Sequence, residues 1–88
     1  MSITAAANTA SRMMQESADA GEFLQLGMMY STGNSVPADM IAAHKWFNIA
    51  AMRGNSEAAR LRREIAGEMS DAEIAAAQRE ARVWFTHH

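Results

Sequence analysis

Five glycines and one proline are the main breaks in a chain that is otherwise rich in helix-forming residues. Ala, Met, Leu, Glu, Gln and Arg dominate, while β-branched residues are scarce. This balance favours helices because unbranched side chains lose little rotamer freedom in them. No segment alternates between apolar and polar residues as a half-buried strand does. The breaks divide the chain into pieces of helical length, so the sequence predicts an all-α fold.

Length and composition exclude several classes of protein. With 88 residues the chain forms one small domain, which leaves no depth for a large cofactor cavity beside a core. The absence of cysteine excludes a disulfide scaffold, a thiolate zinc site and a cysteine nucleophile. No apolar run approaches the roughly 18 residues of a membrane span, and no basic segment opens the chain, so we expect a cytoplasmic protein without membrane contact. Neither half has enough basic residues to suggest nucleic acid as a partner.

Four to five helices are expected from the periodicity. Residues 1–17 form a predicted helical arm of mainly small residues, and residues 19–31 place apolar side chains at i, i+3, i+4 and i+7. A further helix is predicted over residues 37–53, with Pro37 in its first turn, and two more over residues 56–66 and from residue 70 onward. The junctions are short, which forces neighbouring helices to lie antiparallel. The chain should therefore fold as successive helical hairpins.

Capping residues mark the expected ends of these helices. The candidates at helix starts are Asp39, Asn55 or Ser56, and Ser70 together with Glu73. Ser70 and Glu73 match a capping box, in which each side chain accepts from the backbone N–H of the other residue. Gly54 follows the last turn of the helix over 37–53, where a C′ glycine commonly ends a helix. The final helix should bury a stripe of Ile74, Ala77, Ala81 and Trp84.

Residues 26–58 also hold a pattern of glycines, alanines and aromatic residues that helical periodicity does not require. The pattern consists of Leu26, Gly27, Tyr30, Gly33, Val36, Asp39, Ala43, Trp46, Ala50, Gly54 and Ala58. It resembles the Sel-one-like repeat, a relative of the tetratricopeptide repeat. Residues 18–54 match one complete repeat, and residues 55–88 resemble the partial second repeat and capping helix of bacterial members. Physically, Gly27 lets two helices approach closely, and the large Tyr30 and Trp46 are expected to fill the space between them.

The resemblance implies a superhelix of the tetratricopeptide-like type, in which the first helix of each unit lines a surface that binds other proteins. It therefore implies a non-catalytic adaptor for a protein or peptide, with no cofactor and no metal. The expected contact residues are Glu22, Gln25, Met28, Met29, Thr32, Arg60 and Arg63. An array usually needs about three repeats to bury its core, and this chain offers about one and a half. The alternative is thus a self-associating subunit, completed by a homodimer through Trp84 and Phe85 or through the amino-terminal arm.

Candidates for catalysis are few, so the sequence does not predict an enzyme. His44 lies half a turn away from the face of Ala43 and Ala50, which predicts a surface histidine. His87 and His88 are expected to be the frayed end of the chain. The basic cluster of Arg53, Arg60, Arg62 and Arg63 alternates with acidic residues, which favours a solvated helical face with an Arg60–Glu64 ion pair. Contact with an anionic group of a partner remains the alternative for this cluster.

Overall fold

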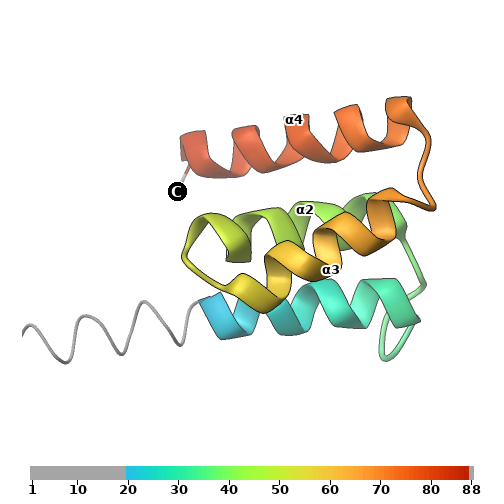
Figure 1. The fold of residues 1–88 in the computed structure, drawn as a ribbon, viewed down its shortest axis with the longest axis horizontal. Coiled ribbons are helices and arrows are strands. Elements are labelled where there is room, and N and C mark those ends of the chain that lie inside the picture. The colour runs from blue at the N-terminus through green and yellow to red at the C-terminus, as the bar shows by residue number, and fades with distance from the viewer. Residues whose placement is uncertain (1–19, 88) are drawn as a thin grey trace, which may run out of the picture.

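The computed structural model describes residues 20–87, and within this range the chain forms four helices joined by turns, without a strand (Figure 1). The first covers residues 20–32. It is followed by α2 (Met40–Met52), α3 (Ser56–Ala66) and α4 (Asp71–His87). The all-α prediction is confirmed. The predicted arm over residues 1–17 and the terminal His88 lie outside the described residues.

The second helix, α2, occupies the centre of the fold. Helix 20–32 lies along one side of α2, α4 lies along the opposite side, and α3 crosses between them in front (Figure 1). The helix α2 packs against both α3 and α4. Consecutive helices run in opposite directions, as the short junctions predict. The chain is therefore a pair of successive helical hairpins that share α2 as their common partner.

The start of α2 differs from the prediction. Asp39 is the N-cap, with extended backbone (φ −153°, ψ 104°), and its carboxylate accepts a hydrogen bond from the Ala42 N–H at 3.1 Å. The helix thus begins at Met40, and Pro37 lies before the cap rather than in the first turn. At the other end Arg53 is the C-cap, and Gly54 follows with φ 98°, which confirms it as the C′ glycine.

Side-chain caps also fix the starts of α3 and α4. Of the two candidates before α3, Asn55 is the cap, and its side-chain oxygen accepts from the Ala58 N–H at 2.8 Å. The capping box before α4 is confirmed in both directions. The Glu73 N–H donates to Ser70 Oγ at 3.1 Å, and the Ser70 N–H donates to Glu73 Oε1 at 2.9 Å. Local sequence alone therefore determines where these two helices begin.

The core lies between helix 20–32, α2 and α3. Its buried members are Ala43, Phe47, Ala50, Ala58 and Ile65, against which Phe23, Leu24, Tyr30, Met40, Ala51, Leu61 and Met69 pack. The Phe47 ring lies directly on Gly27, where any Cβ would overlap it. Phe47 therefore takes the place against Gly27 that was predicted for Trp46, whereas Trp46 lies between the two helices at another point, where its ring stacks on Phe23. Neighbouring positions on a helix point about 100° apart, so Phe47 enters the gap and Trp46 points toward α4.

Trp46 instead belongs to a half-buried aromatic cluster that joins three helices. Its ring stacks on Phe23 of helix 20–32, with centroids 5.7 Å apart, and meets the edge of Trp84 of α4 at 6.3 Å. Phe23 and Trp84 are also in contact, at 5.1 Å. Beside this cluster the predicted stripe of α4 is confirmed, because Ala77 and Ala81 are completely or almost completely buried. Small residues and aromatic rings together hold α4 in place.

Candidate functional site

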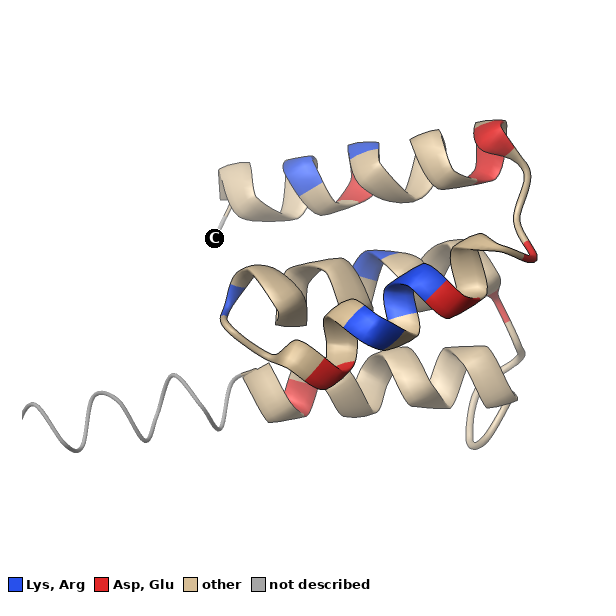
Figure 2. Ribbon diagram, in the orientation of Figure 1, with Lys and Arg blue, Asp and Glu red and all other residues tan. Residues whose placement is uncertain are grey.

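The predicted contact face of helix 20–32 is accessible. Glu22, Gln25, Met28 and Thr32 are exposed and Met29 is half-buried, which places the predicted residues along the side opposite the core. Glu22 is the only charged residue of this helix, whereas α3 and α4 carry charges of both signs along their length (Figure 2). The structure therefore brings together one methionine-containing face whose single charged residue is Glu22.

A depression of about 420 Å³ lies at the carboxyl end of this face. It is lined by Gln25, Met28, Met29, Thr32, Asn34 and Ser35. The Thr32 hydroxyl donates back to the Met28 carbonyl at 2.8 Å, so its hydrogen-bonding capacity is partly used within the helix. The remaining walls combine two thioether side chains with the amides of Gln25 and Asn34. This mixture suits an apolar side chain flanked by polar groups.

The loop after helix 20–32 forms the rim of the depression. Gly33 has φ 73°, and its N–H donates to the Met29 carbonyl at 2.8 Å. Ser35 also has a positive φ of 74°, which is uncommon for a residue with a side chain. The Asp39 N–H donates to the Tyr30 carbonyl at 2.9 Å and ties the end of the loop to the helix. Leu26 and Val36, two further residues of the repeat-like pattern, are half-buried.

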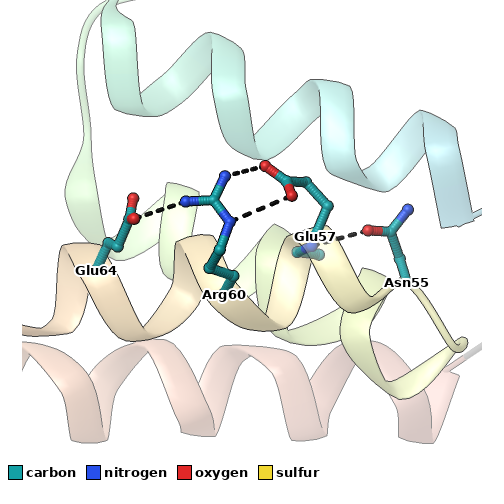
Figure 3. Close-up of polar contacts among 5 residues, drawn as sticks. Asn55, Glu57, Arg60 and Glu64 are labelled. Atoms are coloured by element: carbon teal, nitrogen blue, oxygen red, sulfur yellow. Dashed lines mark hydrogen bonds and ion pairs between the residues drawn. The ribbon is translucent and has the colours of Figure 1, made fainter.

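Arg60 lies in an ion-pair network on α3 (Figure 3). Its guanidinium contacts Glu64 Oε1 at 2.7 Å, which confirms the predicted pair, and Glu57 accepts two further hydrogen bonds from it. The hydrogen bond from Arg60 lowers the pKa of Glu57, and the same bond raises the pKa of Arg60. A partner that uses Arg60 must compete with both carboxylates, whereas Arg63 is simply exposed.

His44 is buried, contrary to the prediction of a surface histidine. Only 3% of its surface is exposed, and its Nδ1 has no hydrogen-bond partner among the described residues. Burial is the main cause of a lowered His44 pKa, and the positive charge of Arg62 lowers it further. The prediction assumed that α2 buries one face. Because α2 has helices on several sides, a second face is buried as well.

Arg62 is another residue whose role the sequence did not reveal. It is half-buried rather than solvated, and its guanidinium donates to Asn48 Oδ1 at 2.6 Å, which links α3 to α2. One signal was present in the sequence. Residues 40–52 contain a single Lys and no acidic residue, a composition typical of a helix that is covered on more than one side.

Neither a family model nor a curated protein nor a solved structure shows significant similarity to this chain. Within residues 20–87, no three histidine or acidic side chains come together as a metal site. None of the helices in this range combines the length and the apolar character needed to cross a lipid bilayer.

Proposed function

We propose that this chain is a non-catalytic adaptor that binds a protein or peptide segment through the exposed face of helix 20–32. The observation that carries the proposal is the depression of about 420 Å³ on this face, where Met28 and Met29 lie beside polar side chains. Met28 is 47% exposed, so its side chain is available to a partner. Exposed apolar side chains gathered at a depression are typical of binding surfaces.

The composition of this face points to the kind of segment it takes. Methionine is flexible and polarizable, so it can pack around an apolar side chain of varied shape. The Gln25 and Asn34 amides offer donors and acceptors on either side, and the face lacks a basic residue that would favour an acidic ligand. We therefore expect a short segment with one apolar anchor and uncharged polar neighbours. The resemblance to Sel-one-like repeats supports the same assignment.

Selection from a random peptide library tests the proposal without knowledge of the natural partner. The 88-residue chain is used as bait, and the selected peptides are located by NMR shift changes at Gln25, Met28 and Thr32. A Met28→Glu variant should weaken binding by about tenfold or more, since a central apolar contact is lost and a charge is placed in the depression. Gln78→Glu, an exposed change on α4, is the matched control and should bind normally.

Two results would overturn the assignment. One is the recovery of peptides whose binding maps entirely to other faces of the molecule. The other is equal affinity of the selected peptides for the original chain and for the Met28→Glu variant, provided that both give the same far-ultraviolet circular dichroism.

A further inference from the structure

A second, larger depression runs along α4. Its volume is about 660 Å³ and its walls are mostly apolar, formed by Lys45, Ala76, Arg79, Glu80, Val83, Trp84 and His87. Val83 is 57% exposed at its centre. Lys45 forms the part of the wall that comes from α2. Its ammonium group lies 4.3 Å from the centre of the Trp46 ring, and this contact holds the Lys45 side chain in place. No role has yet been given to this groove.

The groove lies on a face of α4 that the described residues leave uncovered. The helix buries Ala77 and Ala81 against its neighbours, and Trp84 contacts Phe23 of helix 20–32. Ala76, Arg79, Glu80 and Val83 line the groove and recur at the spacing of a single helical face. One continuous stripe of α4 is therefore available to another helix.

The stripe is complementary in charge and size to the same stripe of a second, antiparallel copy. A two-fold axis that passes between positions 79 and 80 places Arg79 opposite the partner's Glu80, and Glu80 opposite the partner's Arg79. The same axis places the small Ala76 opposite the large side chain of the partner's Val83. Charge and size are thus matched in one register of two antiparallel helices. A stripe that served an unrelated partner would need no such internal match.

We propose that two copies of this chain associate through α4, antiparallel and about this two-fold axis, with each groove occupied by the partner's Val83. The interface is isologous, so each ion pair and each apolar contact is made twice. It involves little more than one helix from each copy, which places it at the small end of specific interfaces and predicts a dissociation constant of about micromolar or weaker. The peptide-binding face of helix 20–32 stays free in the dimer, so the two proposals are independent.

Charge exchange between positions 79 and 80 tests the pairing. Arg79→Glu puts two acidic residues opposite each other twice, and Glu80→Arg does the same with two basic residues. Each variant should weaken association by about tenfold in sedimentation equilibrium, because attraction is replaced by repulsion. The double variant Arg79→Glu with Glu80→Arg restores both pairs, and so does an equal mixture of the two single variants. Arg63→Glu, the same charge change on α3, should leave association unchanged.

The absence of cysteine allows the register to be tested directly. Ala76→Cys and Val83→Cys are made separately, mixed and oxidised. The proposed register predicts a disulfide between position 76 of one copy and position 83 of the other, in preference to disulfides between identical positions.

Each of three results would overturn the proposal. The first is a chain that remains monomeric at millimolar concentration. The second is a dimer whose stability does not respond to the charge exchange. The third is a dimer in which the disulfides join identical positions, because that result requires either another register or parallel helices. Melting temperatures equal to that of the original chain exclude unfolding as the cause of a change in association.

Discussion

The two sides of α2 are packed in different ways. Toward helix 20–32 and α3, the ring of Phe47 lies on a glycine, only 1% of the residue is exposed, and the surrounding alanines are fully buried. On α4, Ala77 and Ala81 are buried, whereas Trp84 and the Trp46 ring that it meets stay half-buried. Ile49 of α2 is fully buried as well, but it does not belong to the core cluster around Phe47. The first side holds a large side chain without space to spare, whereas the second side leaves a groove. The difference predicts that the largest single loss of stability follows truncation of Phe47, while the groove beside α4 stays open to a partner.

Phe47→Ala should have the largest effect on stability. Truncation of a fully buried aromatic residue costs about 3–5 kcal/mol, because contacts are lost and a cavity remains. Urea denaturation followed by circular dichroism measures the change. Phe85→Ala on α4, where the ring is half-buried, is the comparison and should cost clearly less. Equal losses for the two variants would show that the two sides of α2 contribute alike.

Gly27→Leu should be the next most harmful change. A side chain at Gly27 overlaps the Phe47 ring, and forced overpacking of this kind costs about 1–3 kcal/mol. The clash requires both partners, so a double-mutant cycle isolates it. In the Phe47→Ala background, Gly27→Leu should cost much less, since leucine can then occupy the vacated space. Additive losses would mean that the two residues are not in contact.

Trp46→Ala should destabilise the chain less than Phe47→Ala, by about 2 kcal/mol, because the indole is only half-buried. The loss arises from the ring contacts with Phe23 and Trp84. Trp46→Phe keeps an aromatic ring at this position and is the matched control. A loss as large as that of Phe47→Ala would show that the aromatic cluster, rather than the glycine contact, is the main source of stability.

Much of the fold could be predicted from the sequence. The capping box of Ser70 and Glu73, the C′ position of Gly54 and the cap at Asp39 depend on residues within one turn of each other, so local pattern identifies them. The choice between Trp46 and Phe47 at the Gly27 gap depends on how α2 is rotated about its axis. That rotation results from the packing of three other helices, which no local pattern contains.

The sequence predicted only those parts of the candidate sites that lie within one helix, because the packing between helices is not encoded in a local pattern. The exposed face of helix 20–32 follows from helical spacing, and the structure places Gln25, Met28 and Thr32 together around a depression. The groove of α4 includes Lys45 from α2, so it exists only after two separate helices have packed. The buried His44 was missed because the number of helices around α2 is a property of the whole fold.

Ser70→Ala tests whether α4 is held more loosely than the other helices. Loss of an N-cap side chain costs about 1 kcal/mol. If α4 opens on its own, amide hydrogen exchange should accelerate within α4 while the amides of α2 keep their protection. Asn55→Ala at the start of α3 is the matched control, and its effect should spread to α2 through the shared core. Uniform acceleration over all helices in the Ser70→Ala variant would instead show that the fold opens as a single unit.

The smallest effect at neutral pH is expected from His44, whose titration lowers the stability only in acid. Its pKa in the folded chain is lowered from 6.5, mainly by burial and further by Arg62. Below pH 6.5 the unfolded chain therefore binds more protons at this residue than the folded chain does. The contribution to stability is complete above that pH, and it is lost as the pH falls toward the lowered value.

A His44→Leu variant separates this contribution from that of other groups. Leucine removes both the titrating group and the unpaired Nδ1. The melting temperature should therefore fall less between pH 7.5 and pH 5 than in the original chain, a range that includes the ordinary histidine pKa of about 6.5. Arg62→Gln should keep most of the pH dependence, because burial is the larger cause of the lowered pKa. His87→Gln, at an exposed histidine, should leave the dependence unchanged. If His87→Gln removes it and His44→Leu does not, the buried histidine is not the group that responds to acid.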